Sequence, residues 1–152
     1  MNISAKADYA ICAAVALAAT DGDAPVKGEA LARSQDIPTK FLENIMGDLR
    51  KAGIVSSQRG AVGGYWLARP ADEITLADVI RAVDGPLANV RGTRPEQTAY
   101  HGVTEALVDV WIAVRASLRS VLEAVTLADV VAGRLPARVA RMAGDPEAWQ
   151  PH

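Results

Sequence analysis

Residues 37–70 read IPTKFLENIMGDLRKAGIVSSQRGAVGGYWLARP, and this stretch decides the fold. Within residues 38–51 apolar side chains recur at helical spacing, which predicts an amphipathic helix with one inward stripe: Phe41, Leu42, Ile45, Met46 and Leu49. Asp36 is the expected N-cap, Pro38 the expected first helical residue, and Gly53 the expected left-handed residue after the helix. The rest of the stretch has β-forming side chains on both sides of a glycine-rich centre. We therefore expect a hairpin whose flexible tip carries an arginine.

Three more helices are expected around this stretch. Apolar spacing predicts helices over residues 3–19, 27–34 and 73–83, with Ser4 capping the first and Thr75 near the start of the last. Three helices followed by a glycine-tipped hairpin within the first 70 residues are the order of elements in a winged helix-turn-helix domain. The expected fold is therefore mainly α with a small β-hairpin.

A longer periodic segment follows an aperiodic loop. From Val103 to Val125 apolar residues recur every three or four positions, which predicts a long helix with one apolar stripe. A stripe of this length on so small a domain needs a partner surface, so we interpret it as a dimerisation helix; packing against its own winged-helix domain is the alternative. The predicted dimerisation residues are Val103, Leu107, Val110, Trp111, Val114, Leu118, Val121, Leu122 and Val125.

These elements predict four segments. They are a winged-helix DNA-binding domain (1–85), a sensor or linker loop (86–102), dimerisation helices (103–133) and a loosely held C-terminal tail (134–152). Within the third segment, Thr126 should cap a short helix.

Composition narrows the class of protein. The chain has 152 residues, of which 50% are hydrophobic and 22% charged, as in an ordinary globular domain. Its apolar runs are far shorter than the roughly 18–20 residues that a membrane span requires. Asp8 within the first run argues against a signal peptide, and one cysteine allows no intramolecular disulfide. These features predict a cytoplasmic protein with no membrane partner.

The charge pattern favours a polyanionic partner. The net charge is −2, yet residues 38–69 carry five basic side chains against two acidic ones, a local charge of +3. The apolar stripe of the predicted helix leaves Lys40, Glu43 and Asn44 outward, where such side chains can read base edges in a major groove. Arg59 among glycines at the hairpin tip can enter the adjacent minor groove. The alternatives are a solvated helix face, a merely flexible hairpin, or a phosphate-binding loop that lacks the usual glycine–lysine order.

Four blocks of the sequence carry a family resemblance: MNISAKADYAICAAVALA, IPTKFLENIMGDLRKAGIVSSQRGAVGGYWLARP, ITLADVIRAVDGPL and VLEAVTLADVV. They resemble the Rrf-two family of bacterial winged helix-turn-helix transcriptional regulators, which includes IscR, NsrR and CymR, over about residues 1–133. The resemblance implies a homodimer that binds a pseudo-palindromic operator in double-stranded DNA, usually as a repressor. The DNA-binding residues predicted in this way are Ser4, Lys6, Pro38, Thr39, Lys40, Phe41, Glu43, Asn44, Arg50, Ser57, Arg59, Gly60, Gly63 and Gly64.

The sensor is where the sequence departs from the family. Iron–sulphur members carry three cysteines before the dimerisation helix, whereas NVRGTRPEQTAYHGVTE at residues 89–105 has none. Neither a cluster, another cofactor nor a metal is therefore expected, and Asp8, which matches a carboxylate that some relatives donate to a cluster, is interpreted as an ordinary helix residue. Cys12 is either a buried, inert cysteine or a thiol switch at the dimer interface. The remaining effector hypotheses are a protein partner on the loop and a small-molecule pocket lined by Trp111, Tyr100, Leu87 and Val90, with Arg91 or Arg94 as anchors.

Catalysis is not expected. The sequence offers no nucleophile–base pair, no metal-ligand spacing and no paired carboxylates in a predictable cleft, and His101 is interpreted as a surface loop residue. The rival to a DNA-binding regulator is a winged-helix module that has lost DNA binding and acts through proteins, which the net acidity favours. The operator, the regulated genes, the effector, the choice between repression and activation, and the role of the tail do not follow from the sequence.

Overall fold

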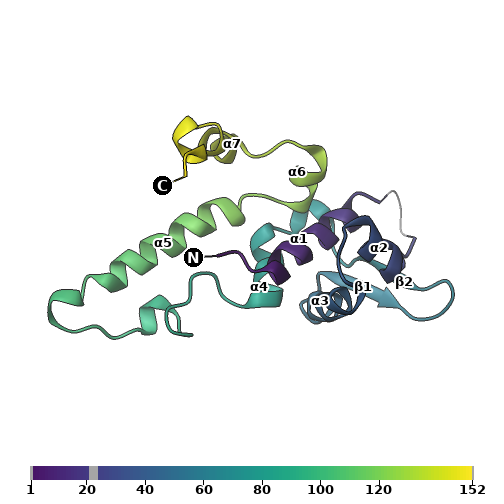
Figure 1. Ribbon diagram of the computed structural model, residues 1–152, viewed down its shortest axis with the longest axis horizontal. Coiled ribbons are helices and arrows are strands. Elements are labelled where there is room, and N and C mark those ends of the chain that lie inside the picture. The colour runs from purple at the N-terminus through teal and green to yellow at the C-terminus, as the bar shows by residue number, and fades with distance from the viewer. Residues whose placement is uncertain (1, 21–23, 152) are drawn as a thin grey trace.

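The computed structural model describes residues 2–20 and 24–151 and has a helical body from which one helix projects (Figure 1). The body is formed by α1 (Ala5–Ala18), α2 (Gly28–Ser34), α3 (Thr39–Lys51), β1 (Val55–Gln58), β2 (Gly64–Leu67) and α4 (Leu76–Asp84). The later elements are α5 (Leu107–Leu122), α6 (Leu127–Ala132) and α7 (Ala137–Ala143), and 3₁₀ turns lie at Ala71–Glu73, Pro95–Gln97, Gly102–Thr104 and Pro146–Trp149. The predicted mainly helical fold with a small hairpin is thus confirmed.

Side-chain caps start three of the helices where the sequence predicts them. The Ser4 hydroxyl accepts a hydrogen bond from the backbone N–H of Ala7 at 2.9 Å at the start of α1. Thr75 and Thr126 each form a complete capping box, at the starts of α4 and α6, with an aspartate three residues later. These local signals fix three helix starts before any tertiary contact is considered.

The predicted start of α3 was wrong in its details. Pro38 occupies the N-cap position without a capping side chain, and Asp36 lies two residues earlier with a φ of 53°. The reason is tertiary, because Ile37 is buried and its N–H donates to the Ala32 carbonyl of α2 at 2.8 Å. The turn that follows α2 therefore holds Asp36 away from the first N–H groups of α3. Gly53 ends the helix with a φ of 72°, as predicted.

The hairpin, called the wing from here on (residues 55–67), is held at both of its sides. β1 and β2 pair antiparallel, with Val55 opposite Leu67 and Gln58 opposite Gly64. On the outer side of β2, Val26 exchanges two backbone hydrogen bonds with Tyr65, both of 2.8 Å. The segment that leads into α2 is thus a third, single-bridge strand that fixes the base of the wing against the helices.

One core joins α1, α3 and α4, and α6 returns to it. Leu42, Ile45, Met46 and Leu49 of α3 are fully buried, which confirms four of the five residues of the predicted inward stripe. Leu127 of α6 is buried in the same cluster, and two backbone hydrogen bonds join its segment to α4: Leu76 to Val125 at 3.0 Å and Leu127 to Ile74 at 2.9 Å. The chain therefore leaves the body after α4 and re-enters it at residue 125.

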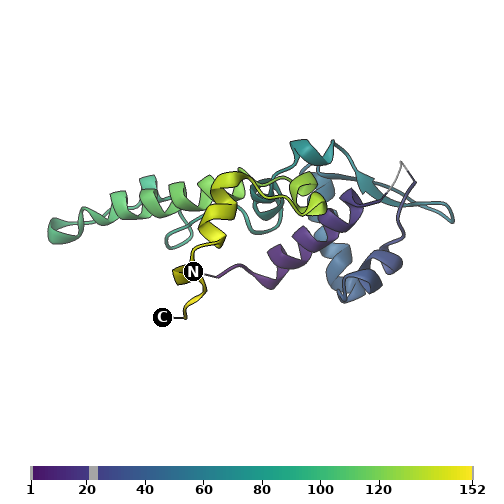
Figure 2. The same cartoon turned by 90° about the horizontal axis from the view of Figure 1, so that it is seen from above.

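α5 projects from the body, and its free end lies opposite the wing along the long axis in both views (Figures 1 and 2). The prediction of one helix from Val103 to Val125 was wrong at both ends. Val103 lies in a 3₁₀ turn and is fully exposed, whereas Val125 follows the helix and is buried in the core of the body. Gly102, with a φ of 61°, lies between the loop and the helix. The helix ends at Leu122 because Val125 is packed into the core of the body.

The C-terminal segment, predicted as a loosely held tail, contains a short helix. Its residues Ala137–Ala143 form α7, with Val139 buried, and the indole N–H of Trp149 donates to the Ala143 carbonyl at 2.7 Å. The sequence prediction missed this helix because ARVARMA has only two large apolar side chains and no cap. Among the described residues, no helix is long and apolar enough to cross a bilayer.

Candidate nucleic-acid interface

One face of α3 is polar and open to solvent. Thr39, Lys40, Glu43 and Asn44 are exposed, while the opposite side of the helix lies in the core. Gly47 continues this face, and a Cβ atom placed there would meet nothing within 4 Å. The helix can therefore approach another molecule with these side chains leading, as base readout in a major groove requires.

The wing tip presents Arg59 beside a hydrogen-bonded turn. Arg59 is exposed, and no hydrogen bond or ion pair joins it to the described part of the chain. Behind it the Gly60 carbonyl accepts from the N–H of Gly63 at 3.0 Å and from the Lys27 ammonium at 2.9 Å. Gly60 has a φ of 104°, a backbone conformation that glycine adopts without strain. Lys27 thus supports the tip from the start of α2.

Two glycines bring the wing backbone into close contact with its neighbours. A Cβ atom on Gly63 would lie 2.1 Å from the Gln58 carbonyl oxygen, inside the hairpin itself. A Cβ atom on Gly64 would lie 2.5 Å from the Val26 carbonyl oxygen, in the contact that docks the wing on the body. These predicted interface residues therefore act through the shape of the wing rather than by presenting a side chain.

A groove of about 570 Å³ separates the wing from the start of α3. Its walls are Lys27, Gly28, Glu29, Thr39, Leu42, Glu43 and Tyr65. At the other end of α3 the Arg50 guanidinium donates to the Ser57 hydroxyl of β1 at 3.3 Å. Wing and helix are thereby held at a fixed spacing. Lys27 was missed by the sequence analysis, since nothing in its local pattern marks it as reaching Gly60 across the fold.

Ser4, Lys6 and Phe41, three of the predicted interface residues, are engaged inside the chain. The Lys6 ammonium lies 2.7 Å from an Asp48 carboxylate oxygen and 3.1 Å from the Val83 carbonyl. Ser4 caps α1 and its hydroxyl donates to Asp84. The Phe41 ring packs edge-on against Tyr9 of α1, with ring centroids 5.6 Å apart. These residues fix α1 against α3 and α4.

The Lys6–Asp48 pair makes the stability of the chain depend on pH. The hydrogen bond from Lys6 lowers the pKa of Asp48 below its ordinary value of 3.8, so the pair stabilises the fold above that pH and is lost as the pH falls through the lowered pKa. We expect Lys6→Met to reduce the free energy of unfolding by about 0.5–1 kcal/mol at pH 7, and by much less near pH 3. Urea denaturation at both pH values measures this difference.

Lys51→Met is the matched control. The Lys51 ammonium lies 3.8 Å from the other Asp48 oxygen and is largely exposed, so its loss should change the unfolding free energy little at either pH. Equal losses in the two variants at pH 7 would show that the Lys6 contact has no special weight.

Cys12 lies half-buried on α1, one turn after Asp8. Burial, and then the negative charge of Asp8, raise the pKa of the Cys12 thiol above its ordinary value of 9.0. The thiol is therefore protonated at neutral pH, and a protonated thiol is a poor nucleophile. This environment favours the inert alternative over the thiol switch.

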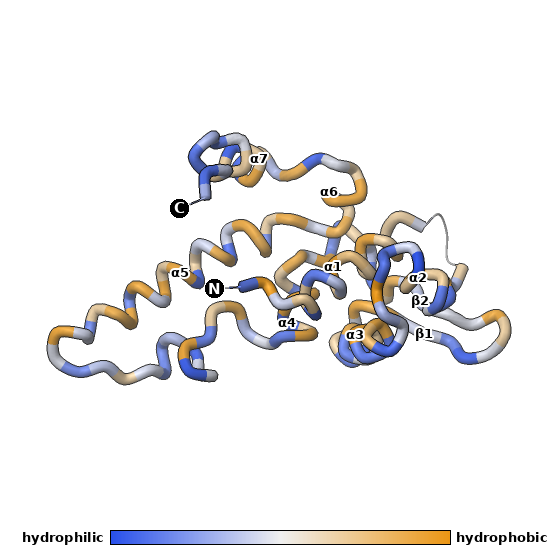
Figure 3. The backbone as a smooth tube through the Cα atoms, viewed as in Figure 1, coloured by the Kyte–Doolittle hydropathy of each residue, from blue (hydrophilic) through white to orange (hydrophobic). Residues whose placement is uncertain are grey.

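Apolar residues recur along the whole of α5 (Figure 3). Five of the predicted dimerisation residues lie together on one side of this helix. The hollow along this side measures about 760 Å³, and its lining, called the dimer face below, is Ile3, Val110, Ala113, Val114, Ser117, Leu118, Val121, Leu122 and Met142. Trp111 points elsewhere, because its indole N–H donates to the Tyr100 hydroxyl of the loop at 2.9 Å. The sequence did not predict four residues of this lining. Ala113 and Ser117 are too small to stand out in an apolar period, and Ile3 and Met142 lie far from α5 in the sequence.

Comparison with known proteins agrees with this geometry. The sequence pattern of the Rrf2 family, described as iron-dependent transcriptional regulators, matches residues 3–133. The chain belongs to the Rrf2 family. It is 52% identical over 145 residues to Rv1287 of Mycobacterium tuberculosis, which is named as an HTH-type transcriptional regulator; the match covers 95% of this chain and 90% of that protein. The family and this relative are transcriptional regulators, not enzymes. The fold of the chain is the winged-helix fold of the family.

Two solved Rrf2 structures share the fold. CymR of Bacillus subtilis, titled the global cysteine regulator, superimposes with a TM-score of 0.73 at 32% identity, over 88% of this chain and 98% of that one. IscR of T. potens superimposes with a TM-score of 0.66 at 31% identity, over 100% of this chain and 93% of that one. Rrf2 regulators bind DNA and typically act as dimers. The family therefore uses one surface for DNA and another for a second copy of the chain.

The residues of this chain do not fit the iron–sulphur cluster of such regulators. Clusters need several thiolate ligands, and the sequence has one cysteine, on α1 and not in the loop before α5. The loop offers His101, Glu96 and Glu105 instead, and Glu96 is already paired with Arg115. Within residues 2–20 and 24–151, no group of three metal-binding side chains lies together.

Proposed function

We propose that this Rrf2 protein is a homodimeric repressor that binds a pseudo-palindromic operator without an iron–sulphur cluster. The observation that carries the proposal is the fixed spacing between the polar face of α3 and the arginine-tipped wing. A helix face that carries Lys40, Glu43 and Asn44 suits base edges in the major groove. An exposed guanidinium on a tip of glycines suits the narrower groove beside it. Because its target is DNA, the protein acts in the cytoplasm.

The apolar side of α5 supports the proposed dimer. The dimer face combines a 760 Å³ hollow with exposed Ile3, Val110 and Met142, and a patch of this kind on a small domain is typical of a contact surface. Two-fold pairing of α5 would cover it and present two α3 helices to successive turns of one duplex. In this arrangement residues 1–85 read DNA, residues 86–102 connect and sense, residues 103–133 dimerise, and residues 134–152 cover part of the same face through Met142.

Arg59→Ala tests the role of the wing. The duplex is first selected from a random-sequence pool by the wild-type protein, and affinity is then measured by mobility shift. We expect the substitution to weaken binding by about 1–3 kcal/mol, because it removes the side chain that enters the minor groove. Arg141→Ala on α7 makes the same change of charge on an exposed helix far from the wing and should leave affinity unchanged. Equal affinity of wild type and Arg59→Ala refutes the minor-groove contact.

The rival, a winged-helix module that acts only through proteins, rests on the net charge of −2. A titration of genomic DNA fragments with the protein at a series of salt concentrations distinguishes the two functions. Binding through phosphates gives an affinity that falls steeply as salt rises, because counterions are released from the duplex. A protein that shifts no fragment even at low salt supports the rival.

A further inference from the structure

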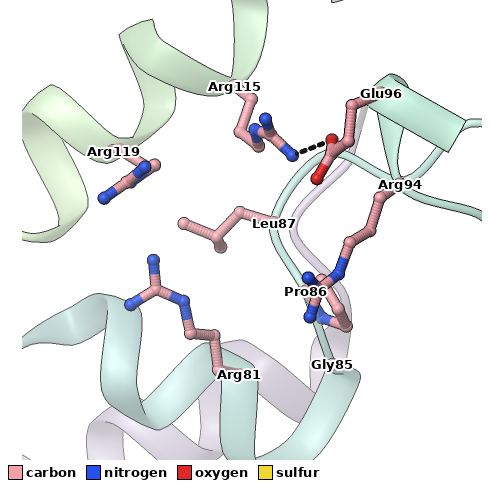
Figure 4. Close-up of a pocket in the computed structure, with 8 residues that line it drawn as sticks. All are labelled: Arg81, Gly85, Pro86, Leu87, Arg94, Glu96, Arg115 and Arg119. Atoms are coloured by element: carbon pink, nitrogen blue, oxygen red, sulfur yellow. Dashed lines mark hydrogen bonds and ion pairs between the residues drawn. The ribbon is translucent and has the colours of Figure 1, made fainter. Parts of the chain in front are cut away.

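A cleft of about 480 Å³ lies between α4 and α5, outside the nucleic-acid interface. It is called the arginine cleft here and is lined by Arg81, Gly85, Pro86, Leu87, Arg94, Glu96, Arg115 and Arg119. Arg81, Arg115 and Arg119 extend toward the same space around Leu87, and Arg94 reaches in from the loop beside Pro86 (Figure 4). Its lining comes from α4, from α5 and from the loop between them, and includes no residue of α3 or of the wing.

The arginines of the cleft outnumber the carboxylates that face them. Arg115 pairs with Glu96 at 2.6 Å. Arg81 and Arg119 share a single oxygen of Glu123, which is not among the lining residues. Arg94 forms no ion pair with the described residues. Four guanidinium groups are therefore balanced by two carboxylates, which leaves an excess of two positive charges among these residues, and Arg94 is the one arginine of the cleft without an ion pair in the described chain.

This excess of positive charge persists at neutral pH. Guanidinium groups do not lose their protons in proteins. The pKa of Glu123 is held below its ordinary value by the hydrogen bonds from Arg81 and Arg119, and that of Glu96 by its own backbone N–H and then by Arg115. Both carboxylates are therefore ionised already, and no proton rearrangement can balance the remaining charge.

We propose that the arginine cleft binds a small dianion, such as a dicarboxylate or a phosphate monoester, and that this ligand is the effector of the regulator. The two negative charges of a dianion match the excess of two positive charges, and planar guanidinium groups bind carboxylate and phosphate oxygens in pairs. Of the residues expected from the sequence to form a pocket, Leu87 and Arg94 line the cleft, whereas Val90 does not. Trp111, Tyr100 and Arg91 instead pack on one another, with Arg91 5.4 Å from the Tyr100 ring centre.

The position of the cleft gives the ligand a means to act on DNA binding. Arg81 belongs to α4, which is packed into the DNA-binding body, whereas Arg115 and Arg119 belong to α5. A dianion held by both helices would therefore change the preferred angle between the body and the dimer face, and with it the spacing of the two α3 helices. A ligand shifts such an equilibrium by its difference in affinity for the two arrangements. The effector role thus rests on the proposed function, but the binding site does not.

The site is tested first without DNA. Succinate, glycerol 3-phosphate and inorganic phosphate are titrated into the full-length protein by calorimetry at constant ionic strength, with acetate as the monoanion. We expect at least one dianion to bind saturably with one site per chain, and acetate not to bind. Arg94→Gln should weaken that binding at least tenfold and leave the melting temperature of the ligand-free protein unchanged, because Arg94 has no ion pair to lose. Arg138→Gln, the same change on exposed α7, should bind like wild type.

The other outcomes contradict the site. Absence of saturable binding by all three dianions overturns it, as does equal binding by wild type and Arg94→Gln. An equal loss in Arg138→Gln means that binding follows overall charge and not the cleft. If Arg94→Gln changes the dimer dissociation constant and not anion binding, a carboxylate of the second copy fills the cleft and the proposal falls.

The effector role is tested separately on the duplex selected by the wild-type protein. A bound dianion should change operator affinity at least tenfold in wild type and not in Arg94→Gln. Dianion binding with unchanged operator affinity retains the site and overturns its effector role. Dianion binding by a protein that shifts no duplex overturns the proposed function and leaves the site standing, so the two failures are distinguishable.

Discussion

Replacing Ala113 by glutamate is expected to turn the protein from a dimer into a monomer. Ala113 is exposed in the single chain and lies on the dimer face, so a charged side chain costs the isolated chain almost nothing. In the dimer the same carboxylate would be buried among apolar side chains without a partner, at a cost of about 2 kcal/mol in each copy. Because two-fold symmetry applies the cost twice, the dimer dissociation constant should rise by about a thousandfold.

Ala116→Glu is the matched control for this substitution. Ala116 is also exposed, lies on the same helix one turn away, and is not part of the dimer face. Sedimentation velocity over a range of concentrations measures the dissociation constants, and circular dichroism verifies that both variants keep their helices. Operator affinity should fall together with dimerisation in Ala113→Glu, because one α3 helix reads only one half-site. Two variants that remain equally dimeric would mean that the chains associate through another surface.

Local signals in the sequence were sufficient to predict α3 and the wing. The apolar spacing of residues 38–51 predicted α3, and glycines between β-forming residues predicted the wing. Three hydroxyl side chains marked the starts of α1, α4 and α6. Each of these features is decided within a few residues of the chain, by periodicity, capping or turn geometry, so a single sequence is enough to find it.

The features that were missed depend on contacts between distant residues. Val125 continues the period of α5 but is drawn into the body, where its carbonyl accepts from Leu76. The sequence suggests that Lys6 is a free cation near the start of a helix, yet an Asp48 carboxylate oxygen of α3 lies 2.7 Å from its ammonium. No periodicity predicts either contact. The arginine cleft is a stronger case, because its four guanidinium groups come from three segments that the sequence keeps apart.

The wing also depends on such a distant contact, which the sequence analysis did not foresee. Gly63 and Gly64 were predicted as interface residues, but the reason for glycine at these positions became visible only with Gln58 and Val26 in place. The wing can carry its arginine at a fixed distance from α3 because backbone packs directly on backbone there. The shape of the hairpin backbone at Gly63 and Gly64 therefore decides where Arg59 lies.

Gly63→Ala should consequently weaken operator binding at least tenfold without removing any side chain from the interface. The added Cβ would lie 2.1 Å from the Gln58 carbonyl oxygen, a backbone atom that cannot rotate away, so the tip of the hairpin has to open. We expect a loss of about 1–3 kcal/mol in the free energy of unfolding, as for other backbone strain of this kind. Urea denaturation and mobility shift with the selected duplex measure the two effects.

Two controls separate the shape of the wing from general effects of the substitution. Gly47→Ala also adds a methyl group to a glycine, but into open space within α3, and should raise the unfolding free energy by about 0.5–1 kcal/mol because glycine is unfavourable inside a helix. Val62→Ala trims an exposed side chain at the wing tip and should leave operator affinity unchanged. If Gly63→Ala binds the duplex like Val62→Ala, the position of Arg59 does not depend on the closed hairpin. The groove contact must then be made by a wing that rearranges on DNA.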